Sequence, residues 1–390
     1  MMSLKNAKTL FVRPETLTLL RLIKGGLLAN LCKLPNLEQS KQMIELAKTS
    51  KLNKYAYIFA PFGRKNQAVA KSLENGERVT LLVGNDIVGH IDVADTFKFD
   101  PDWADKNLFS YPDEFGKKQY GEIAISGEFT LLQDPIAAAR NELEKLKIRQ
   151  NAHTVTVVAL TADPFNRAHE RLVRMTVDKA DILVIILKHT SAEMGLAFKL
   201  RQQMMEYFIQ SYLPPSRVII IPLEYADALT LHADPSIECL LAARLGATKI
   251  VLGQKHTGIG MFYDAEGAHT VLDFYKEMLG LDIVILPELV YCNKCRTIVS
   301  TKTCPHGQHH HINYHSDTIK QLFFAGIMPP AILMRPDISA MILESLFPAR
   351  FADIQRLCDE LFPSSGLIEE RSERDFYEEL MKLYQTGSLT

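Results

Sequence analysis

The sequence lacks long hydrophobic runs, and its charges favour neither sign. No apolar stretch in its 390 residues approaches the roughly 18 residues of a membrane-spanning helix, which excludes an integral helical membrane protein. Lysine and arginine number 44 against 46 acidic residues, so the overall charge gives no reason to expect nucleic acid or a membrane surface as partner. The N-terminal residues have no apolar signal-peptide core, and we therefore expect a soluble, cytoplasmic protein.

Cysteine is scarce as well, since six residues in a chain of this length are far too few for a disulfide framework. Three of the six nevertheless lie close together and are followed by four histidines: Cys292, Cys295 and Cys304, then His306, His309, His310 and His311. This spacing predicts a structural zinc site of three thiolates and one histidine that pins a loop. We choose His309 as the fourth ligand for its reach. The alternative is a loop of reduced thiols beside a coincidental histidine run.

The second part of the chain alternates apolar strands with helical segments. The predicted strands are 154–160, 181–187, 217–221, 249–252 and 282–285. The predicted helices are about 167–179, 194–212, 235–245 and 268–280. Continuous apolar strands are typical of parallel sheets that are covered on both faces. We therefore predict an α/β, doubly wound parallel-sheet domain that binds ligands at the carboxyl ends of its strands.

The first 150 residues and the last 60 follow other patterns. Short β-rich runs over 79–83 and 87–93 flank a Gly-Asn-Asp turn, and 120–132 is a further strand candidate. Helical patterns cover 37–48 and 134–147. We predict an α+β or β-barrel-like N-terminal domain and a helical tail whose clearest pieces are 338–347 and 374–384.

A candidate phosphate site follows the first parallel strand. The chain there reads Thr161-Ala162-Asp163-Pro164-Phe165-Asn166-Arg167-Ala168-His169-Glu170. A strand end, a short loop and a helix start expose amides and a positive dipole end to anions. Asn166 and His169 project from one side of the first helical turn and would hold the phosphates of a nucleotide. The alternative is an N-cap asparagine and a surface histidine, and Asp163 is either a magnesium-facing carboxylate or a cap.

These motifs resemble the ATP sulfurylase (sulfate adenylyltransferase) family of nucleotidyltransferases. The family signature Gln-Thr-Arg-Asn-Pro-x-His-Arg-Ala-His-Glu is matched at Thr161, Pro164, Arg167, Ala168, His169 and Glu170. A second signature, Gly-Arg-Asp-His-Ala-Gly, corresponds to Gly253-Gln254-Lys255-His256-Thr257-Gly258. The stretch from Val290 to Gly307 is similar to a zinc-binding insertion in part of the family. The agreement in order and spacing runs from about residue 75 to 345.

The resemblance implies a domain organisation and an assembly. It implies a β-rich, PUA-like N-terminal domain over 1–150 and a nucleotidyltransferase domain over 151–328. A zinc-binding insertion would lie near 292–311, and a small helical C-terminal domain would cover 329–390. Family members commonly form homo-oligomers, so a homo-oligomer is expected here.

The resemblance also implies a reaction, in which an oxyanion attacks the α-phosphorus of magnesium-bound ATP. With sulfate the products are adenosine 5′-phosphosulfate and pyrophosphate. Catalytic roles would fall on Thr161, Asn166 and His169, and ATP binding on Asn166, His169, Gly253, His256 and Val290. The acceptor side would comprise Ala162, Asp163, Gln254, Lys255 and Thr257, joined by Lys188 at the carboxyl end of the second strand.

Substitutions on the sulfate side leave the acceptor open. The family's sulfate-holding arginine and glutamine are Ala162 and Leu160 here, and each lost charged hydrogen bond is worth about 1.5–3 kcal/mol. Asp163 replaces an asparagine and adds negative charge beside anionic reactants. A motif resembling Ile-Ser-Gly-Thr-x-x-Arg keeps only a basic end, Lys320. Two alternatives therefore remain: an enzyme of this fold with a different oxyanion acceptor, or a weakly active or inactive nucleotide-binding paralogue.

Overall fold

The computed structural model describes residues 8–28, 31–49, 57–100, 103, 120–189, 195–226, 236–253, 271–362 and 370–385. Contacts divide the chain into two compact units. Unit 1 comprises Met1–Ala159, Asp181–Ala192 and Ile219–Ile285, and unit 2 comprises Leu160–Ala180, Glu193–Val218 and Leu286–Thr390. The domain boundaries expected at residues 150 and 328 stay predictions.

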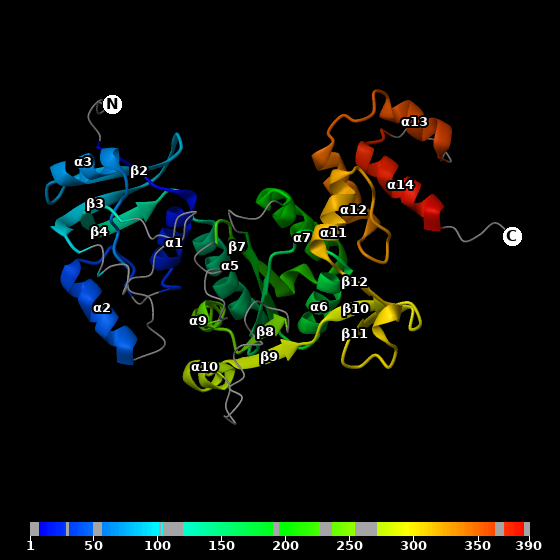
Figure 1. Cartoon of the computed structure of the whole chain (residues 1–390), viewed down its shortest axis with the longest axis horizontal. Coiled ribbons are helices and arrows are strands. Elements are labelled where there is room, and N and C mark those ends of the chain that lie inside the picture. Colours follow the sequence, from blue (N-terminus) through cyan, green and yellow to red (C-terminus); the bar gives the residue numbers. More distant parts are fainter. Residues whose placement is uncertain are drawn as a thin grey trace. The chain divides into compact units, whose positions relative to one another are not determined.

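Unit 1 begins with a four-stranded sheet in the order β1-β2-β3-β4 (Figure 1). Its strands are β1 (Thr9–Phe11), β2 (Arg78–Val83), β3 (Asp86–Lys98) and β4 (Ile123–Leu131). β1 runs parallel to β2, whereas β2–β3 and β3–β4 are antiparallel pairs. Val79, Leu81, Ile91 and Val93 are all buried, because alternate residues of a strand share one face. The three predicted β segments are thus confirmed, while the PUA-like assignment stays a prediction.

The second sheet of unit 1 has five strands in the order β7-β6-β5-β8-β9. They are β5 (Val155–Leu160), β6 (Ile182–Lys188), β7 (Val218–Leu223), β8 (Lys249–Gly253) and β9 (Asp282–Leu286). Every residue of β6 is buried, and β5 pairs in parallel with β8, as predicted. The strand order reverses between β5 and β8, and in open α/β sheets ligands bind beyond the carboxyl ends of the strands at such a point.

Helices connect these strands and contribute to the same core. Those of unit 1 are α1 (Pro14–Lys24), α2 (Leu37–Thr49), α3 (Arg64–Ser72), α5 (Pro135–Gln150), α9 (Ser236–Arg244) and α10 (Val271–Leu279). One hydrophobic cluster joins Leu22 of α1 and Leu143 of α5 to Val157, Val184 and Ile250 of the parallel sheet. Part of the N-terminal segment therefore shares its core with the sheet.

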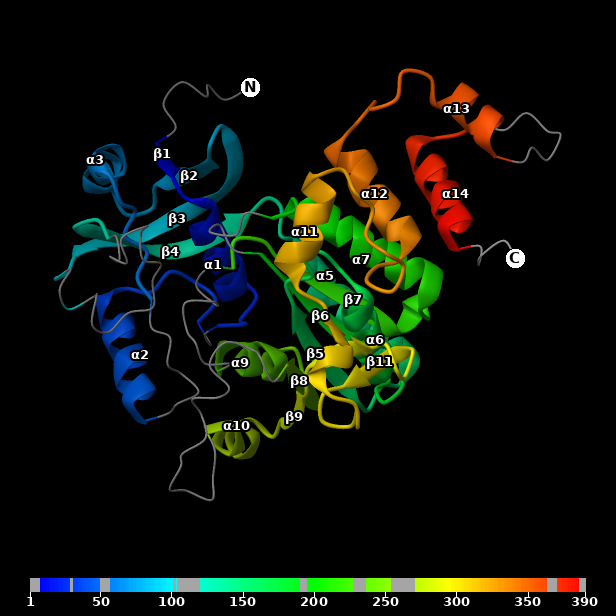
Figure 2. The same cartoon turned by 45° about the vertical axis from the view of Figure 1, so that its right-hand side comes forward.

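Unit 2 contains the helix that follows β5 and the C-terminal elements. Its helices are α6 (Arg167–Val177), α7 (Phe198–Tyr212), α11 (Ser316–Phe324), α12 (Pro336–Leu346), α13 (Ile354–Leu361) and α14 (Glu373–Gln385). Three short strands, β10 (Leu289–Cys292), β11 (Thr297–Ser300) and β12 (His311–Asn313), form a sheet in the order β11-β10-β12. α12 and α14 lie side by side in both views (Figures 1 and 2). They correspond to the predicted helical pieces 338–347 and 374–384, whereas the small C-terminal domain stays a prediction.

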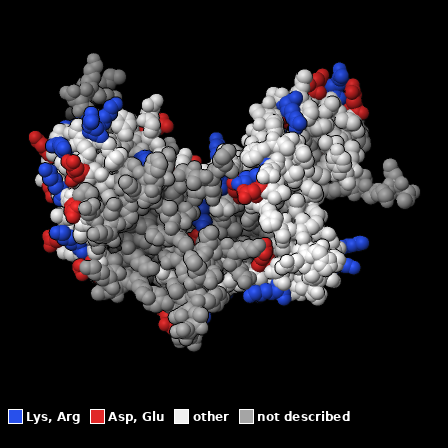
Figure 3. Space-filling model, viewed as in Figure 1, with Lys and Arg blue, Asp and Glu red and all other residues white. Residues whose placement is uncertain are grey.

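The surface agrees with the composition. Over the described part of the face drawn in Figure 3, basic and acidic side chains are interspersed. Within the described ranges, no helix combines the length and the apolarity that a membrane crossing requires. The cytoplasmic location stays a prediction.

Candidate nucleotide site and metal centre

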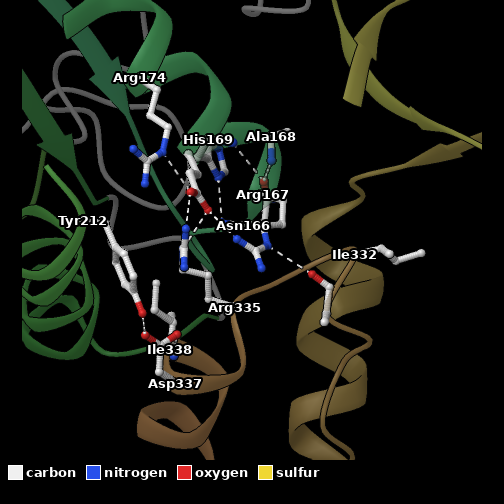
Figure 4. Close-up of polar contacts among 12 residues, drawn as sticks. Asn166, Arg167, Ala168, His169, Arg174, Tyr212, Ile332, Arg335, Asp337 and Ile338 are labelled. Carbon is white, nitrogen blue, oxygen red and sulfur yellow. Dashed lines mark hydrogen bonds and ion pairs between the residues drawn. The ribbon is translucent and has the colours of Figure 1, made fainter. Parts of the chain in front are cut away.

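The first turn of α6 is closed by a reciprocal capping box (Figure 4). Asn166 Oδ1 accepts hydrogen bonds from the amides of Ala168 at 3.0 Å and His169 at 3.2 Å. In return, His169 Nδ1 accepts a hydrogen bond from the amide of Asn166 at 3.2 Å. The structure thus brings the two predicted phosphate-site residues together, and it also bears out the N-cap interpretation of Asn166.

This capping box determines which proton His169 carries. Burial lowers the pKa of His169 to about 4, so the imidazole is neutral near pH 7. The ring stacks on Phe165 at a centroid distance of 5.9 Å. Since Nδ1 accepts a hydrogen bond from a backbone amide, the proton of the neutral ring resides on Nε2. His169 is therefore a hydrogen-bond donor at Nε2 rather than a cation.

Asp163 lies just before this turn, and its charge is paired. Asp163 as a whole residue is 5% exposed; Oδ1 accepts a hydrogen bond from the amide of Leu196 at 3.0 Å and Oδ2 accepts one from Lys320 Nζ at 3.0 Å. A Cβ at Gly195 would stand 2.0 Å from Oδ2, so only glycine permits this approach. Both oxygens are thus engaged, which does not fit a magnesium-facing role. Lys320 also offsets the repulsion expected from Asp163.

Lys320 was visible in the sequence only as the basic end of a degenerate motif. Burial lowers the pKa of Lys320, but hydrogen bonds to Asp163 and Asp317 outweigh burial and raise it above its ordinary value. The ammonium therefore stays charged in its partly buried position. Its partner Asp163 lies 157 residues away in the chain, which is why local pattern did not reveal the pair.

Glu170, also in the first turn of α6, pairs with three arginines, which are labelled in Figure 4. Glu170 is 7% exposed and accepts hydrogen bonds from Arg167 at 2.9 Å and Arg174 at 3.0 Å. Arg335 adds two more, at 2.9 and 2.6 Å. The Arg335 guanidinium also stacks over Tyr212 at 3.7 Å. Arg335 and Tyr212 do not stand out in the sequence, since only tertiary contact brings them to α6.

A pH-dependent stability follows from this cluster. Burial raises the pKa of Glu170, but the three arginines outweigh burial and hold it below its ordinary value of 4.5. The stabilisation is therefore complete above about pH 4.5 and is lost as the pH falls through the folded-state pKa. Glu170→Gln should lower the free energy of unfolding by about 3–5 kcal/mol at pH 7, because it leaves the arginines without their counter-charge.

Denaturant unfolding of wild type and Glu170→Gln at pH 7 and below pH 4 tests this expectation. The difference between the two proteins should shrink at the lower pH. Glu360→Gln is the matched control, because it breaks an exposed pair with Arg356 at 3.2 Å and should cost less than about 1 kcal/mol. A difference that does not change with pH would contradict the role given to the ionised carboxylate.

The other residues predicted for the site are either placed by the structure, in one unit or the other, or lie outside the described ranges. Thr161 accepts a hydrogen bond at its carbonyl from Arg201 at 3.2 Å, and Ala162 is fully buried with a φ of 48°. Lys188, in unit 1, is buried in an ion pair with Glu238. Gly253 ends β8, and Val290 is fully buried in β10. Four predicted residues lie outside the described ranges: Gln254, Lys255, His256 and Thr257.

The cysteine cluster comes together at the β10–β11 turn, with a correction to its fourth member. Sγ atoms of Cys292, Cys295 and Cys304 lie 3.5, 3.3 and 3.6 Å from Nδ1 of His306. His309, the predicted fourth ligand, is not part of this group. The reason is local: His306 follows Cys304 by two residues and shares its turn, whereas His309 begins the approach to β12 and stacks on His310.

The distances among these three sulfur atoms and one nitrogen fit four ligands placed tetrahedrally around one metal ion. Ligands at about 2.0–2.3 Å from zinc would stand about 3.3–3.8 Å apart. The observed nitrogen–sulfur distances lie in this range, and Cys295 Sγ is 3.9 Å from Cys304 Sγ. Three thiols and one imidazole are also the donor set that zinc prefers.

Comparison with known proteins agrees with this architecture. A sulfate adenylyltransferase of Deinococcus deserti is 24% identical over 281 residues, which cover 69% of this chain and 72% of that protein. One of Psychrobacter sp. is 26% identical over 292 residues, covering 69% and 68%. Among solved structures, the hexameric APS kinase from Thiobacillus denitrificans shares the fold with a TM-score of 0.58 at 14% identity. That alignment covers 88% of this chain but only 64% of the other.

The sequence profile of the ATP-sulfurylase family matches residues 135–345. This range begins in α5 and ends in α12, and it includes all five strands of the parallel sheet, the capping box of α6 and the cysteine cluster. It covers more than half of the 390 residues. The protein therefore belongs to the ATP-sulfurylase family.

Proposed function

We propose that this protein is a sulfate adenylyltransferase, which transfers AMP from ATP to sulfate and forms adenosine 5′-phosphosulfate and pyrophosphate. Family membership and the relatives' activity support this function. The observation that carries it is the first turn of α6, where the capping box leaves the Nε2 proton of a neutral His169 available to a phosphate oxygen. The positive end of the helix dipole adds to this donor.

The chemistry of this proposal is positioning and charge stabilisation. The acceptor oxyanion attacks the α-phosphorus of ATP in line with the departing pyrophosphate, and no covalent enzyme intermediate forms. A neutral donor such as His169 binds phosphate oxygens without giving up its proton, because its pKa lies far below neutral. Asn166 holds His169 in this tautomer, and Thr161 orients the acceptor. Magnesium accompanies the triphosphate and neutralises part of its charge.

The cysteine cluster has a separate, structural role in this proposal. Cys292, Cys295, Cys304 and His306 would hold one zinc ion with no open position for a reactant. The ion would fasten the β10–β11 turn to the segment that leads to β12. The expected homo-oligomer also remains a proposal, supported by the related structure that is described as hexameric.

A second candidate is an enzyme of the same chemistry with a different oxyanion acceptor. The observation in its favour is the Asp163–Lys320 pair, which places a carboxylate where the family has an amide and engages a cation that would otherwise face an anion. Pyrophosphate release from ATP, measured with sulfate, molybdate, phosphonates and carboxylates, distinguishes the candidates. Release only with sulfate or molybdate supports the first, release only with another acceptor supports the second, and nucleotide binding without release favours an inactive paralogue.

Asp163→Asn tests what this pair does to the acceptor. The asparagine oxygen keeps the hydrogen bond from the Leu196 amide, but the side-chain nitrogen cannot accept one from Lys320, so the ammonium charge is released toward the reactants. We expect the KM for sulfate to fall by roughly fivefold, the effect of about 1 kcal/mol of recovered attraction. Asp317→Asn is the control, because Asp317 also pairs with Lys320 at 3.1 Å but has an 88% exposed side chain. Equal effects of the two substitutions would contradict a specific role for Asp163.

A further inference from the structure

A cationic cavity of about 350 Å³ lies in unit 2, beside α6 and the β10–β11 turn. Four arginines line it: Arg167, Arg171 and Arg174 of α6, and Arg296 of the turn. Glu170 is the one acidic residue of the lining, and Tyr291 with two isoleucines forms its apolar part. Nothing in the proposed adenylyl transfer uses this cavity.

The cavity is separate from the proposed phosphate site on the same helix. At about 100° per residue, Arg167, Arg171 and Arg174 fall within about 60° of one another around the axis of α6. His169 lies on the opposite side, about 160° from Arg171. The two sites therefore face different directions, and a ligand in one does not compete for the side chains of the other.

The one acidic residue of the lining does not neutralise the positive charge of the cavity. The carboxylate of Glu170 is shared by Arg167, Arg174 and Arg335, so these three guanidinium groups exceed it by two charges. Arg171 and Arg296 have no carboxylate partner among the residues that the structure describes. The backbone holds Arg296 in place, because its amide donates to the Cys292 carbonyl at 2.7 Å and its φ is 54°.

We propose that this cavity binds the phosphate of a small phosphorylated ligand, and that the ligand is a nucleoside monophosphate. Guanidinium forks match phosphate oxygens in geometry as well as in charge. The Tyr291 ring and the two isoleucines offer an apolar surface for a base, as in most small-molecule sites. The volume is at the low end of the roughly 300–1,000 Å³ that such sites occupy, which suits a small ligand. The proposal does not depend on the proposed catalytic function.

Isothermal titration of the full-length protein with AMP, pyrophosphate and adenosine tests this site. The double variant Arg171→Gln/Arg296→Gln removes the two unpaired cations and leaves the Glu170 cluster intact. It should weaken AMP binding at this site by roughly tenfold or more, the effect expected from losing charged hydrogen bonds. Lys179→Gln/Lys302→Gln is the matched control; it removes two exposed charges that lie outside the cavity, one just after α6 and one just after β11, and should bind AMP like the wild type.

Comparing the three ligands shows which part of a nucleoside monophosphate the cavity recognises. AMP binding that exceeds both pyrophosphate and adenosine supports a nucleoside monophosphate. Pyrophosphate binding that is as tight as AMP binding and is lost in Arg171→Gln/Arg296→Gln overturns the nucleoside part, and identical AMP isotherms for the two double variants overturn the site. Tight binding of a single-stranded RNA without AMP binding would overturn the nucleotide site and indicate instead an extended basic surface. Pyrophosphate release with sulfate, measured on the same samples, shows separately whether the adenylyltransferase function holds.

Discussion

Replacing His169 by alanine is expected to lower kcat/KM for ATP and sulfate by about 100-fold or more, because one preorganised donor to the phosphates is lost. The imidazole is neutral and its Nδ1 is engaged by the Asn166 amide, so Nε2 is the atom that matters. Turnover is measured as pyrophosphate release, and stability by urea unfolding. The alanine variant should also lose about 1 kcal/mol of unfolding free energy, since the capping box is broken.

His169→Asn separates the two roles of this side chain. The asparagine oxygen lies near the position of Nδ1 and still accepts from the Asn166 amide, but no donor reaches the position of Nε2. Stability should therefore return toward the wild-type value while turnover stays low. Full recovery of turnover in this variant would mean that His169 acts only through the helix cap. Because the pKa of His169 is about 4, its neutral form, and with it this donor, should persist from pH 8 down to about pH 5.

His306→Asn should release the metal that we propose for the cysteine cluster. The protein as purified should contain about one zinc per chain by elemental analysis, and the variant should contain little. Binding of a structural zinc is worth about 10–16 kcal/mol in small peptides, so its loss should open the sheet of β10, β11 and β12. Hydrogen exchange over 289–313 should rise sharply, while exchange in the parallel sheet of unit 1 stays slow.

His309→Asn is the matched control for this prediction. It removes an imidazole from the same histidine run, but His309 is not among the four clustered ligands. Its zinc content and exchange rates should equal those of the wild type. Loss of zinc from the His309 variant, with retention in the His306 variant, would reverse the ligand assignment made from the structure.

The elements of the parallel sheet were predictable from the chain alone. β6 is a run of seven buried residues, and β5 and β8 are similarly continuous, so hydrophobic periodicity located them to within a residue or two. The start of α6 at Arg167 was also predictable, because an N-cap candidate, Asn166, follows the end of a strand and a short loop. Such signals depend on residues that are close in the sequence, so they can be recognised without knowledge of the tertiary contacts.

Ligand choice and charge pairing were less predictable. The cysteine spacing indicated a metal site, but the structure places His306 rather than the predicted His309 beside the three thiols, because the path of the turn rather than reach decides which imidazole arrives there. Asp163 was expected to repel anionic reactants, and the structure pairs it with Lys320. The three-arginine environment of Glu170 was not anticipated either, since Arg335 comes from 165 residues away.

The sequence by itself determined where strands and helices begin, which family the motifs belong to and which cysteines gather. Those properties follow from side-chain periodicity and from backbone hydrogen bonds within a few residues. Only the tertiary structure decided which charges neutralise one another, which nitrogen of His169 carries the proton and which arginines beside α6 have no carboxylate partner within the described ranges. These depend on burial and on contacts between distant segments, because electrostatic energies change with every partner that folding brings within a few ångströms.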